Sequence, residues 1–263
     1  MKRARLLTTL IVSAGVLCAL RAVLQLVMTD TVTGLWLDGF DLAGNTVTAI
    51  MLAVLVLIIA LAGLTTAGHT VALPQRSVAL AIATAALGAT LFVGGVLTLL
   101  QGFAARNVVY ALTAVVAAVM LLWYAFSLMT GRKFFAPLLI ACPAFAAVNL
   151  VFEITSFVGL VTVCNSLFAL LGSCATMMLF TAVAKFAYLG HTAERAARSL
   201  VRYASAAVLL CGMPLVMRLI SVALTGRYPL AFSFSEVVGL AVSLYSVVLI
   251  LSVESRKLEQ QFN

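Results

Sequence analysis

The chain has 263 residues, of which 64% are hydrophobic and only 9% are charged, and its mean hydropathy is +1.20. Soluble domains carry charge on about a quarter of their residues, so this composition excludes a soluble protein. It also excludes a disordered chain, which needs low hydrophobicity and high net charge. The sequence therefore predicts an integral membrane protein.

Eight stretches are long enough to cross the membrane as helices, because a helix needs roughly 20 apolar residues to cross the hydrocarbon layer. Runs such as residues 49–63 are apolar on every face, unlike the alternating segments of a transmembrane β-barrel. The predicted fold is an all-α, polytopic transmembrane bundle, a single membrane domain over residues 1–263 with its spans in four helical hairpins. In chain order, the predicted spans cover residues 6–28, 45–67, 77–100, 108–129, 134–152, 164–189, 203–224 and 232–253.

The positions of Lys and Arg predict the orientation, because cytoplasmic loops are enriched in these residues. If both termini are cytoplasmic, only Arg106 and Arg227 lie in outer loops, and Arg21 and Arg218 lie within spans. The inner cations are then Lys2, Arg3, Arg5, Arg76, Arg132, Lys133, Lys185, Arg195, Arg198, Arg202, Arg256 and Lys257. The net charge of +8 therefore reflects how the chain is oriented in the cell membrane. A nucleic-acid-binding protein would cluster its cations on one soluble face, so no nucleic-acid partner is expected.

A second interpretation of the amino-terminal segment stays open. Basic residues followed by an apolar stretch also begin a secretory signal peptide. Residues 6–28 are longer than a usual signal core, and Arg21 would interrupt that core. Cleavage would leave seven spans with the amino terminus outside, whereas the uncleaved chain has eight.

Local composition predicts three further features. The outer segment over residues 29–44 has three Asp and three Gly, which is typical of a turn-rich surface loop. Between residues 190 and 202, Glu194 precedes Arg198 by four residues, which favours a short interfacial helix. Pro143 and Pro214 fall inside the fifth and seventh spans, where we expect static kinks, with a hinge or broken helix as the alternative.

The candidate functional residues are ionisable groups in or beside the spans, because a charge in the bilayer core is expensive and rarely tolerated without a partner. Arg21 and Arg218 lie roughly 23 Å from the inner ends of their spans at 1.5 Å per residue, and Glu153 and Glu236 lie at the same outer depth. Polar residues share their helix faces at spacings of three or four. The predicted charge cluster is Arg21, Gln25, Asn149, Glu153, Arg218, Ser221 and Glu236, with Thr225, Gly239 and Ser243 on the same faces.

This cluster has two interpretations. It forms an outward-facing site where the arginines bind a small polar or anionic solute, or it consists of arginines that extend to the headgroups and of Arg–Glu pairs that hold helices together. The first interpretation predicts a small transporter or solute-binding membrane component. The second predicts a non-catalytic membrane subunit, scaffold or sensor that contacts a partner subunit.

An intramembrane enzyme that uses Glu153 or Glu236 as an acid or base ranks third. The only histidines, His69 and His191, lie in inner loops, and no catalytic, nucleotide-binding or metal-binding motif occurs. We therefore expect no cofactor, no metal and, on balance, no enzymatic activity.

Overall fold

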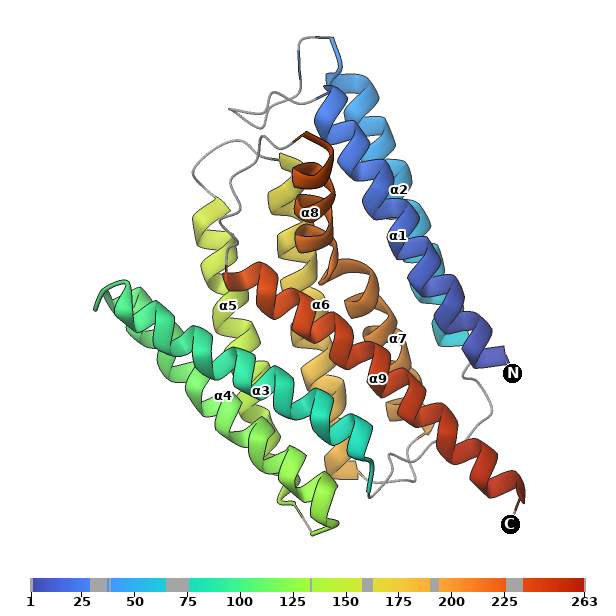
Figure 1. Cartoon of the computed structure of the whole chain (residues 1–263), viewed down its shortest axis with the longest axis vertical. Helices are drawn as coiled ribbons and strands as arrows, with labels where there is room; N and C mark the ends of the chain where they lie inside the picture. The colour runs from blue at the N-terminus through green and yellow to red at the C-terminus, as the bar shows by residue number, and fades with distance from the viewer. Residues whose placement is uncertain are drawn as a thin grey trace.

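The structure is a computed structural model, and it describes residues 2–28, 37, 39–64, 76–132, 134–157, 163–189, 194–225 and 234–262. Within these residues all regular secondary structure is helical, as Figure 1 shows. The helices are α1 (Lys2–Met28), α2 (Asp41–Leu64), α3 (Val78–Leu100), α4 (Ala105–Thr130), the short 3₁₀ helix η1 (Ala136–Ile140), α5 (Ala141–Phe157), α6 (Val163–Leu189), α7 (Glu194–Leu210), α8 (Met213–Thr225) and α9 (Phe234–Phe262).

Eight helical segments of the described residues are long and apolar enough to cross a membrane, which confirms the predicted all-helical, multi-pass class. Their outward surfaces are apolar: Val56, Leu112 and Val151, for example, are each more than half exposed. Soluble monomers rarely expose such large apolar surfaces, so these faces are suited to contact with lipid.

The structure corrects several predicted boundaries. The fourth span begins at Ala105, so Arg106 lies in the first turn of α4 and not in a loop. The segment predicted to be a separate interfacial helix is, from Glu194 onward, the start of α7. Pro143 lies in the first turn of α5, directly after η1, where a missing N–H breaks no helical hydrogen bond. Pro143 thus lies where the span changes from the 3₁₀ helix to α5 and not within a continuous α-helix, and a kink of the span there stays a prediction.

The seventh predicted span is two helices. Cys211 N–H donates to the Ala207 carbonyl at 3.0 Å at the end of α7, and Val216 N–H donates to the Gly212 carbonyl at 3.1 Å at the start of α8. Pro214 has no N–H to donate to the Leu210 carbonyl, so the helical ladder stops between these bonds. Pro214 thus lies just after a break in the helix. A broken helix was the alternative to the static kink that we expected there.

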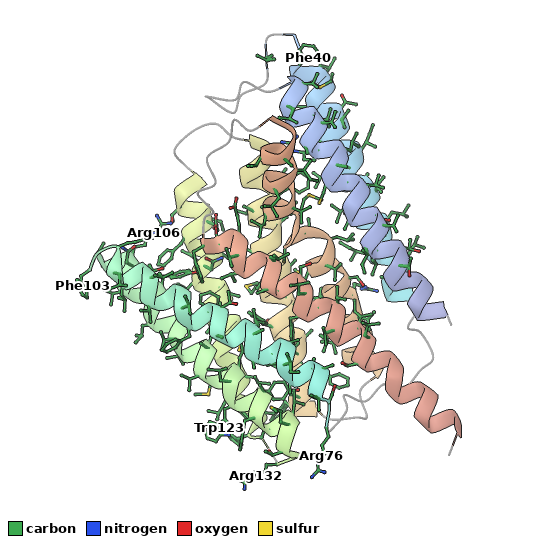
Figure 2. All side chains as sticks on the ribbon, in the orientation of Figure 1. Phe40, Arg76, Phe103, Arg106, Trp123 and Arg132 are labelled. Atoms are coloured by element: carbon green, nitrogen blue, oxygen red, sulfur yellow. The ribbon has the colours of Figure 1, made fainter. Side chains whose placement is uncertain are left out.

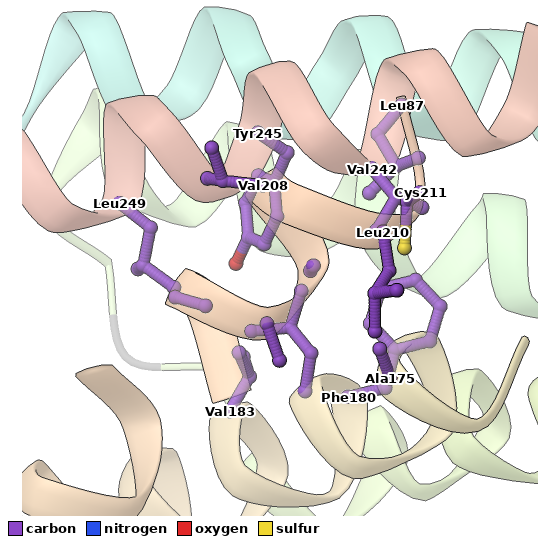
Figure 3. Packing of buried hydrophobic residues seen from close by; sticks show 14 of the residues in the cluster. Leu87, Ala175, Phe180, Val183, Val208, Leu210, Cys211, Val242, Tyr245 and Leu249 are labelled. Atoms are coloured by element: carbon purple, nitrogen blue, oxygen red, sulfur yellow. The ribbon is translucent and has the colours of Figure 1, made fainter. Parts of the chain in front are cut away.

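The span that contains this break is the centre of the bundle. Of the residues from Ser199 to Val216, 72% are buried, against 22–44% for the other seven spans. Helix α7 packs against α6, α9, α2 and α1. Figure 3 shows part of the resulting core, with Leu87 of α3, Ala175, Phe180 and Val183 of α6, Val208 and Leu210 of α7, and Val242, Tyr245 and Leu249 of α9.

The remaining helices lie around this centre. Helices α1 and α2 run side by side along one flank, and α3 packs most extensively on α4 along the opposite flank (Figure 1). Helix α9 crosses between them and packs on both α3 and α7. The start of α1 and the end of α9 lie toward the same end of the molecule.

Candidate functional site

Arg21 is a charged residue in the interior of the bundle. Its side chain is 2% exposed, and Cys18 and Leu24 on the same face of α1 are also buried. Leu20 and Val23, which point to the other side of α1, are about half exposed. The guanidinium therefore faces protein, and it does not extend along a lipid-facing surface to the headgroups.

An aromatic ring from another helix contacts this guanidinium. The Cζ atom of Arg21 lies 5.9 Å from the ring centroid of Phe168, which is buried on α6. A cation over an aromatic face within about 6 Å is attracted by the ring quadrupole. Arg21 is seven residues from the end of α1 at Met28, about 10 Å along the helix, so the contact lies well below that end.

The other predicted arginine, Arg218, lies on the neighbouring helix α8, and Gln25 lies on α1 itself. The side chains of both residues are outside the described part of the structure. Helix α1 packs against α8, which carries Arg218 and Ser221. The backbone positions of Gln25, Arg218 and Ser221 are helical, and nothing is described of their side chains. The grouping of Arg21 with Arg218 therefore stays a prediction.

Glu153 belongs to a group of residues where the start of α4 meets the carboxy-terminal part of α5. Its half-buried carboxylate interacts electrostatically with Arg106 and with Tyr110 of α4. The Arg106 Nη2 atom donates to the Phe152 carbonyl at 3.3 Å, and its Cζ atom lies 5.2 Å from the centroid of the Phe152 ring. Arg106 thus links the first turn of α4 to the end of α5 and supplies a positive charge to Glu153.

Sequence reasoning missed Arg106 and Tyr110 as members of this group. A usable signal was present: the two residues are four apart at the start of one span, and Glu153 lies at the end of the next span. Consecutive spans that run in opposite directions bring such ends together. The assignment of Arg106 to a loop hid this relation.

Asn149, one turn before Glu153, is engaged between helices. Its Nδ2 atom donates to the Ser173 hydroxyl of α6 at 3.2 Å, and both side chains are half-buried. Nearby on α5, the Phe145 ring meets Tyr110 edge-on, with centroids 5.5 Å apart. These contacts connect α4, α5 and α6 below the Arg106–Glu153 pair.

Glu236 lies in the first turn of α9 and is half-buried. A carboxylate is favoured there because a helix amino terminus carries partial positive charge. One and two turns further along α9, Gly239 lies against the Cys211 carbonyl and the Ser243 hydroxyl donates to the Val208 carbonyl at 3.2 Å. This face of α9 thus packs against the α7–α8 break.

The described members of the predicted cluster lie on three helices: Arg21 on α1, Asn149 and Glu153 on α5, and Glu236 in the first turn of α9. That they form one site stays a prediction. Among the described residues, no group of three His, Cys, Asp or Glu side chains is arranged to hold a metal ion.

The fold and the apolar exterior define a multi-pass helical membrane protein. Comparison with known proteins finds no family model, no curated protein and no solved structure that matches the chain.

Proposed function

We propose that the protein binds a small anionic or polar solute inside the membrane region and acts as a small transporter or as the solute-binding component of one. The observation that carries this proposal is the position of Arg21. Among the side chains that the structure describes, it is the only charged one that is buried.

The energetics of a membrane interior support a role for this residue. A charge at the bilayer centre costs at least about 2.5 kcal/mol, and charged residues that face a bundle interior are concentrated on solute and ion pathways. A guanidinium also offers a planar fork of N–H donors, which matches a carboxylate or phosphate group. The position about 10 Å below the end of α1 suits a ligand that enters from that end.

The broken helix beside α1 gives independent support. Both α7 and α8 contact α1, and the break between them lies in the most buried span. Interrupted helices near the middle of the membrane are a recurring feature of transporter binding sites, where one half of a helix moves relative to the other. The proposed solute site thus lies beside an element that permits such movement.

A second candidate, a non-catalytic membrane subunit, is favoured by a different observation. Two members of the predicted cluster interact with other helices: Asn149 donates to Ser173 of α6, and Glu153 interacts electrostatically with Arg106 of α4. Polar contacts of this kind stabilise helix association in membranes. At these two residues the contacts fit a structural role better than a ligand site.

The proposal is tested by ligand-induced stabilisation of the purified full chain in lipid nanodiscs. The probes are lactate, succinate, glutamate and inorganic phosphate, each compared with sodium chloride at equal ionic strength. A ligand at ten times its Kd adds about 1.4 kcal/mol to the free energy of unfolding. We expect at least one probe to produce such a shift, and Arg21→Gln to remove it.

Two further variants make this experiment specific. Arg76→Gln, at the other end of the molecule, serves as the control and keeps the shift. Arg21→Lys keeps the charge but lacks the fork of N–H donors, so we expect it to weaken the shift. This variant takes the place of Arg21→Gln if Arg21→Gln does not fold. A shift that persists in folded Arg21→Gln contradicts the proposal. Absence of any shift, together with a membrane protein that co-purifies at fixed stoichiometry, would support the second candidate.

A further inference from the structure

Two arginines that are distant in the sequence come together where α4 ends and α3 begins. Arg76 precedes α3, and Arg132 follows α4; both are exposed. Figure 2 shows them at the same end of the α3–α4 pair, with Trp123 nearby. We call the surface formed by Arg76, Arg132 and Trp123 the basic corner.

The guanidinium of Arg76 is held in place at this corner. Its Nη2 atom donates to the Thr130 carbonyl at 3.3 Å, at the end of α4. The Arg76 side chain also lies against Gly131, at the position that a Cβ on residue 131 would occupy. This contact uses one of five N–H donors, so Arg76 is fixed next to the turn and still presents donors for an anion.

The turn that carries Arg132 is held as well. Gly131 N–H donates to the Ser127 carbonyl at 2.8 Å, and the Ser127 hydroxyl donates to the Arg132 carbonyl at 2.6 Å. Phe134 then folds back against α4, with its ring edge-on to Tyr124 at 5.3 Å and to Trp123 at 6.2 Å. The backbone of Arg132 is therefore anchored while its side chain is exposed.

An apolar stripe runs from the basic corner along α4. Its residues are spaced by three or four and share one helix face. The stripe consists of Met129, Phe126, Leu122 with Trp123, and Val119, which are 39–56% exposed. Phe135, three residues after Arg132 in the chain, is 67% exposed. A soluble anion would need only the arginines, whereas the stripe provides a surface for an acyl chain attached to the anion.

We infer that the basic corner binds an anionic phospholipid, with its phosphate between Arg76 and Arg132 and an acyl chain along the exposed face of α4. Basic pockets between membrane helices bind anionic headgroups in this manner, and tryptophan is enriched at headgroup depth. Because α3 begins at Val78, two residues after Arg76, its amino-terminal N–H groups add positive potential to the corner. This inference does not depend on the proposed solute site at Arg21.

The test measures how much phosphatidylglycerol the full chain retains after reconstitution in phosphatidylcholine–phosphatidylglycerol nanodiscs and transfer into detergent. Retained lipid is counted by native mass spectrometry. Each arginine near a headgroup contributes about a fivefold factor in affinity. We expect selective retention of phosphatidylglycerol and about a fivefold loss in Arg132→Gln, whose exposed side chain is not needed for the turn.

The double variant Arg76→Gln/Arg132→Gln should lose about 25-fold by the same factor. Arg202→Gln is the matched control, since Arg202 is an exposed arginine on α7, and it should retain lipid like the unmodified chain. Equal retention of phosphatidylcholine and phosphatidylglycerol would overturn the inference, as would unchanged retention in Arg132→Gln. Displacement of the lipid by 10 mM inorganic phosphate would identify a free-anion site and would also overturn it.

Discussion

Arg21 combines a charged group with an almost completely buried position. Placing a charge in a membrane interior costs at least about 2.5 kcal/mol, whereas a cation over an aromatic ring gains from about 0.5 to 2 kcal/mol. The contact with Phe168 therefore offsets part of this cost. Charged residues inside membrane bundles are concentrated at functional sites, which is a reason to look for function at this residue.

Gly131 is a position where the backbone itself requires glycine. Its φ is +69°, a left-handed conformation, and Arg76 occupies the space next to it. In Gly131→Ala we expect the free energy of unfolding to fall by about 1–2 kcal/mol, because residues with a Cβ are strained in this conformation. The measurement is chemical or thermal unfolding of the detergent-solubilised chain.

Gly131→Asn is the companion variant for this prediction. Asparagine adopts the left-handed conformation at lower cost but still carries a Cβ. It should therefore lose less stability than the alanine variant, and the difference measures the backbone term. If Gly131→Ala unfolds at the same denaturant concentration as the unmodified chain, the left-handed turn contributes nothing to stability.

At the level of elements, the α7–α8 break depends on small residues from neighbouring helices. The Cys211 side chain donates to the Gly172 carbonyl of α6 at 3.3 Å and lies 3.3 Å from the Thr176 hydroxyl. On the opposite side, Gly239 of α9 allows the Cys211 carbonyl to approach its backbone closely. The break is thus enclosed by protein, which is where irregular backbone is tolerated in a membrane.

Gly239→Ala should disturb this packing. A Cβ at residue 239 would overlap the Cys211 carbonyl oxygen, so α9 must move away from the break. Overpacking a buried site costs typically 1–3 kcal/mol, and we expect a loss of that size in the free energy of unfolding. Unfolding in a denaturing detergent, followed by circular dichroism, measures the change.

The matched control for this variant is Gly15→Ala. Gly15 is also helical, but a Cβ there meets nothing within 4 Å. Alanine is favoured over glycine within a helix by up to about 1 kcal/mol, so this variant should be neutral or more stable. Equal effects of the two substitutions would mean that α9 does not pack closely on the break.

On the scale of the whole molecule, the described cations are distributed unevenly. Arg76 and Arg132 lie at the end of the bundle toward which the start of α1 and the end of α9 also lie (Figures 1 and 2), whereas Arg106 lies at the opposite end of α4. Cytoplasmic ends of membrane proteins gather Lys and Arg. The arrangement suits an orientation with the basic end in the cytoplasm.

We predict that both termini are cytoplasmic in cells. Green fluorescent protein, which fluoresces when it is fused on the cytoplasmic side, should be bright at either end of the chain. Alkaline phosphatase, which is active only outside, should be inactive at both ends. Release of an amino-terminal tag from the rest of the chain, with the carboxy-terminal fusion still bright, would instead support the seven-span interpretation, in which residues 6–28 are cleaved.

Much of the fold could be predicted from the sequence because the membrane imposes a simple rule. A backbone in hydrocarbon must satisfy its own hydrogen bonds, so about 20 consecutive apolar residues mean a helix. The predicted and observed helix ends agree closely in α3, for which residues 77–100 were predicted and Val78–Leu100 are helical. Pro214 also marked the seventh span as irregular, although a kink was expected in place of a break.

Less of the candidate site could be predicted, because side-chain partners depend on how helices pack. The depth of Arg21 followed from residue counting, but its burial against Phe168 did not, since nothing in the sequence relates α1 to α6 in space. Glu153 was expected among the intramembrane arginines, and its described cation is Arg106 of the neighbouring helix.

The sequence alone determined that this protein is a helical membrane protein and where its helices run, because hydrophobicity acts locally along the chain. Only the tertiary structure decided which face of α1 is enclosed, where the seventh span separates into α7 and α8, and that Arg76 meets the end of α4. These features arise from contacts between residues that are distant in the sequence, and apolar helices of similar composition do not specify their own neighbours.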